Sequence, residues 1–307
     1  MATSKNLPLP GIVLTFLGAV LFSTKAIIVK LAFRNEQVDV ITLLALRMLF
    51  SLPFFLGVAI WTRDAAVKPM TARQWVLVSV IGMMGYYISS WFDFIGLQFI
   101  SAGLERLILF LYPSFVALIN MVFFRQLLSR MQKWALLCTY LGIGMAYYGE
   151  LLLDFGNPNF LFGSMMVFFC SITYAIYLSG SGRLIPQVGS TRFTAYAMLA
   201  ATTGVLLHFF FTHEVGDLQL KAGMWKYGLL LAIIATVLPA FLMNAGLKQI
   251  GSNNAAIVSS IGPVSTIAQA YLFLGETMHI GQIAGTVLVI VGVLLIGWKG
   301  RQASGGQ

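Results

Sequence analysis

One lysine lies in the middle of an apolar stretch that is long enough to cross a membrane. Lys25 falls within residues 11–31, on the same predicted helix face as Phe22 and Ile28. A charge at mid-bilayer costs about 2.5–3.5 kcal/mol on insertion scales, so a retained charge is a candidate for function. Lys25 is therefore predicted to hold an anionic group of a substrate, such as a carboxylate. The alternative is a lysine paired with a carboxylate from another helix.

Two adjacent charges stand near the start of the fourth apolar stretch. Arg106 is a candidate ligand for a substrate anion, because a guanidinium binds a carboxylate or phosphate through two parallel hydrogen bonds. Glu105 is expected either to pair with Lys25 or Lys30 or to take up a proton as a coupling group. Both residues have an alternative role in a local ion-pair network that stabilises an outer gate.

Three further charges are predicted to form a supporting polar network: Lys30, Arg47 and Asp93. A structural role is favoured for them, since long side chains near helix ends often extend to water. In the predicted topology all three fall toward the outer side, together with Glu105 and Arg106. An outward-facing polar vestibule is expected there.

Aromatic pairs at helical spacing are candidates for lining a binding site. Tyr87 and Trp91 share a face of the third predicted helix, and Tyr174 and Tyr177 share a face of the sixth. Packing in the core or at the membrane interface is the alternative for each pair.

Prolines interrupt three predicted helices, and each proline frees the carbonyl four residues before it. Such breaks allow bending or present a carbonyl to a cavity, and a static kink is the alternative. The three prolines are Pro113, Pro239 and Pro263.

No motif indicates a metal or cofactor. The three histidines form no HExxH motif, and the chain has no P-loop, so neither a metal site nor ATP-driven pumping is expected. No catalytic residues are predicted, and the chain is interpreted as not an enzyme. A basic domain that tracks nucleic acid is also absent, since the basic residues lie in short loops.

The helices that position these residues are predicted from apolar stretches. Of 307 residues, 59% are hydrophobic and 9% are charged, a composition that suits lipid rather than water. The sequence predicts an all-α membrane protein with ten transmembrane helices. They span about residues 11–31, 40–61, 75–96, 102–124, 132–153, 160–180, 193–212, 225–246, 254–274 and 280–298.

The distribution of basic residues predicts the orientation. With a cytoplasmic N-terminus, twelve Lys and Arg residues fall in inner segments, and only Arg34, Lys221 and Lys226 fall in outer ones. Positive residues favour the cytoplasmic side. Both termini are therefore predicted to be cytoplasmic.

Two parts of the chain resemble each other at an offset of 150 residues. Because five helices per half is an odd number, the second half is expected to enter the membrane from the opposite side. This is an inverted repeat, as in many secondary transporters. The matched positions are Gly96-Leu97 with Gly246-Leu247, Ile100 with Ile250, Pro113 with Pro263, Phe123 with Phe273, Gln132 with Gln282, and Gly142 with Gly292.

Nearly the whole chain resembles the drug/metabolite transporter superfamily, and within it the EamA-type transporters. The resemblance implies two five-helix repeats, residues 1–153 and 154–307, around a central cavity. The first half has Phe124-Arg125-Gln126 where the family often has the Gly-Glu pair seen at Gly275-Glu276. The matching stretches are Phe22-Ser23-Thr24-Lys25, Leu46-Arg47, Gly96-Leu97, Ser101-Ala102-Gly103-Leu104, Leu111-Tyr112-Pro113, Gly246-Leu247, Gly262-Pro263 and Leu274-Gly275-Glu276.

The function predicted from these features is secondary transport of a small polar or anionic metabolite, such as an amino acid, by alternating access. The resemblance implies export or exchange. The expected partners are a small-molecule substrate and the lipid bilayer of a bacterial cytoplasmic (inner) membrane, and the chain is expected to act as a monomer or homodimer. A membrane channel and a membrane-embedded enzyme are the alternatives.

Overall fold

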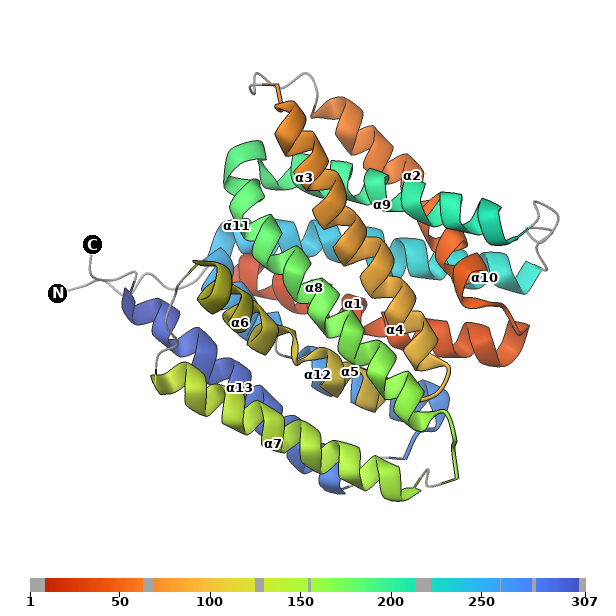
Figure 1. Ribbon diagram of the computed structural model, residues 1–307, viewed down its shortest axis with the longest axis vertical. Helices are drawn as coiled ribbons and strands as arrows, with labels where there is room; N and C mark the ends of the chain where they lie inside the picture. The colour runs from red at the N-terminus through yellow and green to blue at the C-terminus, as the bar shows by residue number, and fades with distance from the viewer. Residues whose placement is uncertain are drawn as a thin grey trace.

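The structure is a computed structural model that describes residues 9–62, 69–124, 130–153, 156–213, 222–259, 261–277 and 280–303. Throughout these ranges the regular structure is helical (Figure 1). The first half holds α1 (Leu9–Glu36), α2 (Val40–Trp61), α3 (Ala72–Gly82), the π-helical turn η1 (Met83–Ile88), α4 (Ser89–Leu97), α5 (Ala102–Leu109), α6 (Tyr112–Phe124) and α7 (Arg130–Leu153).

The second half repeats most of this order. It holds α8 (Phe160–Val188), α9 (Ser190–Thr212), α10 (Ala222–Ala232), η3 (Ile233–Val237), α11 (Leu238–Ser259), α12 (Gly262–Gln269), η4 (Ala270–Leu274) and α13 (Ile280–Ala303). Here α11 stands in the place of α4 and α5, and η4 is a further π-helical turn. The starts of α9, α10, α12 and α13 each lie 150 residues after those of α2, α3, α6 and α7, and η3 starts 150 residues after η1. The two halves are therefore built alike, down to the position of a π-helical turn.

Seven helical stretches of the described chain are long and apolar enough to cross a bilayer. The other three predicted spans are helical but are not among these seven stretches. Span 132–153 falls in α7, span 280–298 falls in α13, and span 254–274 is divided among α11, α12 and η4. The all-helical membrane class is confirmed. The seven are Leu9–Glu36, Val40–Trp61, Ala72–Leu97, Ala102–Phe123, Phe160–Val188, Ser190–Thr212 and Gly223–Met243.

The chain reverses between Ile250 and Gly262, close to the turn expected between residues 246 and 254, although the backbone is helical as far as Ser259. Ile250 packs on Gly11 near the start of α1, whereas the Gly262 carbonyl accepts a hydrogen bond from Ser23 Oγ, farther along α1, at 3.1 Å.

Short polar signals define where the helices start. Asp39 caps α2 by accepting hydrogen bonds from the backbone N–H groups of Ile41 and Thr42, at 2.9 and 3.0 Å. Ser101 caps α5 in the same way, through Leu104 N at 3.0 Å. Gly189, with φ of 85°, permits the reversal between α8 and α9 within one residue.

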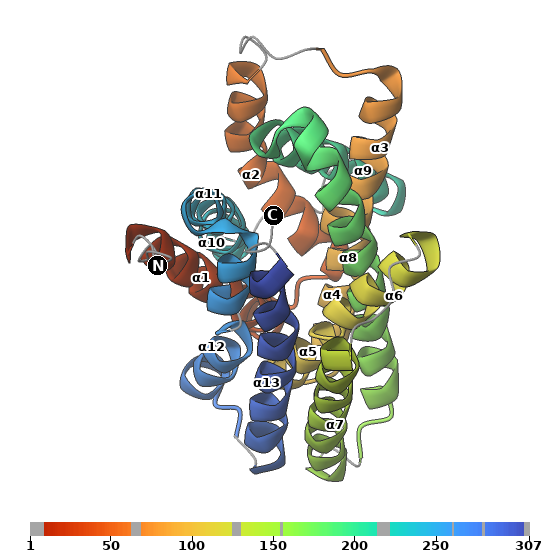
Figure 2. The same cartoon turned by 90° about the vertical axis from the view of Figure 1, so that its left-hand side faces the viewer.

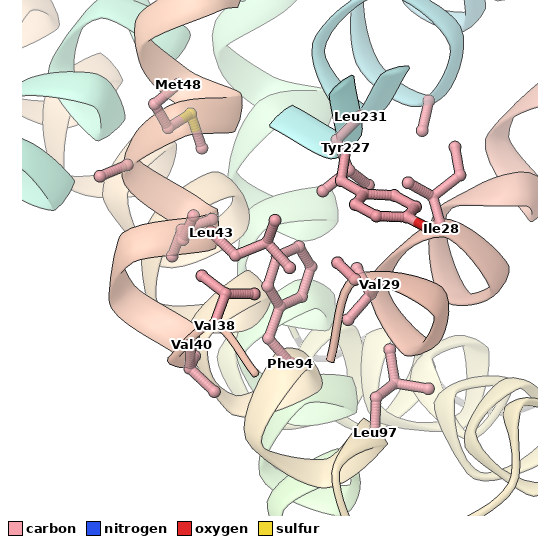
Figure 3. Packing of buried hydrophobic residues seen from close by; sticks show 14 of the residues in the cluster. Ile28, Val29, Val38, Val40, Leu43, Met48, Phe94, Leu97, Tyr227 and Leu231 are labelled. Carbon is pink, nitrogen blue, oxygen red and sulfur yellow. The ribbon is translucent and has the colours of Figure 1, made fainter. Parts of the chain in front are cut away.

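Apolar packing closes one end of the bundle, which we call the sealed end. It comprises the end of α1, the start of α2, the α4–α5 connection and the start of α10. Figure 3 shows the Phe94 ring of α4 among Val29, Val38 and Leu43, and all four side chains are at least nine-tenths buried. The opposite end, at which α1 begins and α8 ends, is called the terminal end.

Helices α7 and α13 lie side by side in both views (Figure 2). Gly142 and Gly285 face each other, and a Cβ atom on either would press on the backbone carbonyl of the other. Gly281 lies against Gly149 one turn away. The small-residue pair Gly281 and Gly285 thus serves a contact within the chain.

Candidate functional site

Lys25 and Asp93 form a buried ion pair between α1 and α4. Their Nζ and Oδ2 atoms are 2.6 Å apart, and the side chains are 7% and 0% exposed. Lys25 shares its helix turn with Phe22, whose ring centroid lies 5.6 Å from Nζ. The pairing that was the alternative for Lys25 is therefore present, and Asp93 belongs to the same charged group.

Arg106 extends this group from α5. Its Nε donates to Thr266 Oγ1 of α12 at 3.1 Å and lies 3.9 Å from Oε2 of Glu105. The guanidinium is 5.8 Å from the same Phe22 ring that Lys25 contacts. Two cations thus flank one aromatic ring, with two fully buried carboxylates, Asp93 and Glu105, behind them.

Arg47 of α2 is buried beside this group, held by hydroxyl groups. Its Nε donates to Thr236 Oγ1 at 2.9 Å, and its Nη1 donates to Ser90 Oγ at 3.0 Å. Thr236 stands in the π-helical turn η3 and itself donates to the Leu231 carbonyl at 2.9 Å. The wider π-helical turn places Thr236 so that it donates to the carbonyl five residues back and accepts from Arg47. π-Helical turns recur at functional sites.

A cavity of about 340 Å³ lies in the centre of the bundle. Lys25, Arg47 and Arg106 line it at mid-depth. From there it extends to Ile185 and Ser190, at the α8–α9 reversal of the terminal end. Its described lining shares Phe55, Met198 and Ala235 with the apolar cluster around Phe94, but Phe94, Val29, Val38 and Leu43 do not line it.

The cavity beside the predicted vestibule charges leads to the terminal end rather than to the sealed end, and which end faces outward stays a prediction. Asp93, Glu105, Arg47 and Arg106 are buried, and the cavity beside them leads toward the terminal end. The apolar residues around Phe94 fill the space that a vestibule at the sealed end would need.

Tyrosines form one wall of the cavity. Tyr86 and Tyr177 join hydroxyl groups at 2.7 Å, and the Tyr174 ring stacks on Tyr177 with centroids 5.8 Å apart. Tyr112 meets Tyr174 edge to face at 5.1 Å. All four line the cavity. The sequence prediction placed Tyr174 and Tyr177 in a binding site but did not include Tyr86 and Tyr112.

Tyr87 and Trp91 do not line this cavity. The Tyr87 hydroxyl hydrogen-bonds to His208 Nδ1 of α9 at 2.8 Å, and the Trp91 ring lies 5.4 Å from the same imidazole. Tyr86 and Tyr87 are neighbours in the π-helical turn η1, and of the two only Tyr86 lines the cavity. Their predicted role in substrate binding stays a prediction.

Lys30 takes part in a polar latch at the sealed end, which comprises Lys30, Glu276 and the backbone of Ile100 and Ala102. Lys30 Nζ donates to the Ile100 carbonyl at 2.7 Å and lies 3.3 Å from Glu276 Oε1. Both Glu276 oxygens accept from Ala102 N, each at 3.1 Å. A carboxylate at a helix start is favoured by the helix dipole. Glu276, which lies between η4 and α13, thus connects this segment to the start of α5.

Glu150 adds a second carboxylate to the same connection, accepting from Ser101 N at 3.2 Å. Neither Glu150 nor Glu276 was among the predicted site residues. The signal that finds them is the start of α5 itself, because its N–H groups require acceptors in a nearly water-free setting.

Two of the predicted prolines mark helix starts, and Pro239 marks the boundary between a π-helical turn and α-helix within one continuous helical stretch. Pro113 is the second residue of α6 and Pro263 the second residue of α12, each after a break in the helix. Pro239 follows the π-helical turn η3 and lines the cavity. All three stand where a helix starts or leaves regular geometry, the positions at which a missing N–H costs least.

The charged group belongs to the first half alone. The positions 150 residues after Lys25, Arg47 and Asp93 are Ala175, Ala197 and Met243. Two similar halves thus supply the framework, and one half supplies the charges.

The comparisons with known proteins agree with this architecture. The sequence pattern of the EamA-like transporter family matches the chain twice, over residues 9–148 and 161–298. The chain belongs to the EamA-like transporter family. It is thus a membrane transporter, and the family is one of transporters rather than enzymes.

Similar proteins include YcbK of Bacillus subtilis (strain 168), named an uncharacterized transporter. It is 31% identical over 280 residues, which cover 90% of this chain and 88% of that protein. The uncharacterized inner membrane transporter YicL of Salmonella typhimurium (strain LT2) is 28% identical over 50% of this chain and 51% of its own length. One solved crystal structure shares the fold, with a TM-score of 0.64 and 16% identity over 95% of this chain and 98% of that one.

Proposed function

We propose that this EamA-family protein is a secondary transporter that moves a small organic anion by alternating access. One observation carries the proposal: the central cavity beside Lys25, Arg47 and Arg106 extends to the terminal end, while apolar packing and the polar latch close the other end. A carrier must close one side of a central site while the other is open. The structure described here fits the conformation that is open toward the terminal end.

The repeated halves support the exchange between two conformations. Each of the helices α2, α3 and α7 has a counterpart that starts 150 residues later. α1 begins at the terminal end, whereas α8 begins at the sealed end, where Asn157 contacts the Phe99 carbonyl at 3.0 Å. We therefore assign ten crossings in two inverted five-helix repeats, residues 1–153 and 154–307.

In this proposal Lys25 and Arg106 bind the substrate anion, and Tyr174 and Tyr177 line its path. Asp93 and Glu105 hold the two cations in place, and Glu105 remains the candidate for proton coupling. Arg47 and Lys30 support the site and the latch. Pro113, Pro239 and Pro263 stand at helix boundaries where the halves can bend.

The distribution of basic residues supports a cytoplasmic location for both termini, in which case the terminal end faces inward. A cavity that loads from the cytoplasm suits an exporter or an exchanger. A bacterial inner membrane is the proposed location, and a relative named an inner membrane transporter supports it. A single chain supplies every described residue that lines the cavity, so a monomer suffices and a homodimer would be two independent carriers.

The proposal is tested first by an untargeted comparison of metabolites in cells, and in their medium, with and without the expressed protein. The compound whose distribution changes is then measured for uptake into proteoliposomes. The double variant Lys25→Met with Asp93→Asn removes both members of the ion pair, which avoids leaving one buried charge unpaired. We expect this variant to fold and to lose transport. Wild-type flux through it would overturn the assignment of Lys25.

A further inference from the structure

The charges at the cavity wall are all positive. Lys25, Arg47 and Arg106 line the cavity, and no Asp or Glu is among its described lining residues. The two nearest carboxylates, Asp93 and Glu105, are 0% exposed and lie behind the wall. A molecule in the cavity therefore meets cations and rings.

Arg106 has unused hydrogen-bonding capacity. Its Nε is engaged with Thr266, but its Nη2 is buried with no hydrogen-bond partner in the described part of the chain. The side chain is only 3% exposed and lines the cavity. A buried donor without a partner is costly, and a bound oxyanion would supply the missing acceptor.

Arg47 leaves its charge without a directly bound carboxylate. Its described partners, Ser90 and Thr236, are neutral hydroxyl groups, and the described ion pairs do not include it. Neutral hydroxyls orient a guanidinium without cancelling its charge. The site therefore carries more attraction for an anion than the Lys25–Asp93 pair alone suggests.

The rest of the wall suits an apolar or aromatic group. The Phe22 ring contacts both cations, with its centroid 5.6 Å from Lys25 Nζ and 5.8 Å from the Arg106 guanidinium. The stacked rings of Tyr174 and Tyr177 face the same cavity. Pockets of this kind bind through apolar area and fix orientation with a few polar groups.

We propose that the substrate class is an organic carboxylate with an aromatic or apolar body and no ammonium group. This deepens the proposed function and rests on it. A zwitterionic amino acid would bring its ammonium group into a wall that holds cations and no described carboxylate. The ammonium would meet no carboxylate among the described lining residues, and it would be repelled by Lys25, Arg47 and Arg106.

Three probes that share one phenylethyl body test the proposal on purified full-length protein. They are 3-phenylpropanoate, which is an anion, phenylalanine, which is a zwitterion, and 2-phenylethylamine, which is a cation. Isothermal titration calorimetry measures their binding. We expect saturable binding of 3-phenylpropanoate, at least about tenfold tighter than phenylalanine, and no binding of the amine.

Arg106 variants tie that preference to the cavity. Arg106→Gln should weaken the binding of 3-phenylpropanoate at least about tenfold. The affinity of Arg106→Lys, which keeps the charge but loses the planar guanidinium, should fall between those of Arg106→Gln and the wild type. Circular dichroism melting shows that each variant is folded, and if Arg106→Gln does not fold, Arg106→Lys carries the comparison.

Equal or tighter binding of phenylalanine would overturn the proposal, as would absent binding of 3-phenylpropanoate or undiminished affinity in the folded variants. If reconstituted protein exchanges a zwitterion instead, alternating-access transport stands and the anion assignment falls. If the anion binds but no exchange occurs for any compound, the anion site stands and the transport proposal falls.

Discussion

Replacing Glu276 by Gln should weaken the polar latch and open the sealed end more often. The carboxylate accepts two 3.1 Å contacts from Ala102 N and faces Lys30 Nζ at 3.3 Å. A hydrogen bond to a charged group contributes about 1.5–3 kcal/mol, and a partly exposed ion pair about 0–1 kcal/mol. Gln keeps a neutral acceptor, so the expected loss is about 1–2 kcal/mol, a shift of about 5- to 30-fold in the ratio of open to closed molecules.

A cysteine introduced at Ala240, a half-buried residue that lines the central cavity, reports this shift, because native Cys170 is 2% exposed and hydrogen-bonded to Ser89. In a Cys138→Ser, Cys170→Ser background, a membrane-impermeant methanethiosulfonate reagent is applied to intact cells and to inverted membrane vesicles. We expect modification of the parent protein mainly in vesicles, through the terminal end. Glu276→Gln should raise the rate in intact cells by about the factor above, since the rate follows the population that is open there.

Asp39→Asn is the matched control for this experiment. It makes the same carboxylate-to-amide change at the sealed end, and Asn caps a helix as well as Asp does. Its labelling rate should equal that of the parent. An unchanged rate in folded Glu276→Gln would refute the role of the latch. Equal labelling of the parent from both sides would refute the closed end itself.

Two further predictions concern buried contacts. Asp93→Asn leaves Lys25 as a buried cation without its partner, so it should destabilise the protein by about 3–5 kcal/mol, and adding Lys25→Met should recover much of this loss in thermal melting. Gly142→Ala places a methyl group against the Gly285 carbonyl and should cost about 1–3 kcal/mol, whereas Gly144→Ala, which meets open space on the same helix, should not lower the melting temperature. Similar melting of the two glycine variants would contradict the tight α7–α13 contact.

The helical framework is readable from the sequence because lipid leaves few alternatives. Apolar stretches of sufficient length predict helices, and the 150-residue offset seen in a few identities recurs in the starts of α9, α10 and α13. The reversal after the eighth span was predicted, but the helical backbone that continues to Ser259 was not, because Gly, Ser and Asn favour a turn in single-sequence reasoning.

The candidate site was only partly readable. Charge inside an apolar stretch singled out Lys25, which is buried, whereas Asp93 was expected to extend toward water and is buried too. Their pairing depends on how α1 packs on α4, which spacing along the chain does not encode. The polar latch was not predicted, because Glu276 accepts a hydrogen bond from a backbone N–H group of a helix distant in sequence. The π-helical turn η1 decided which tyrosine faces the cavity, and a shift of one residue within a helix has no clear sequence signature.

Counterflow in proteoliposomes tests the central claim most directly. Vesicles are loaded with a high concentration of the compound that the metabolite comparison identifies, and a trace of its labelled form is supplied outside. Alternating access through one cavity predicts that labelled compound accumulates transiently above its external concentration, that uptake saturates, and that the Lys25→Met, Asp93→Asn variant shows neither effect. Uptake that rises linearly with concentration and never exceeds equilibration would contradict a carrier and indicate a channel.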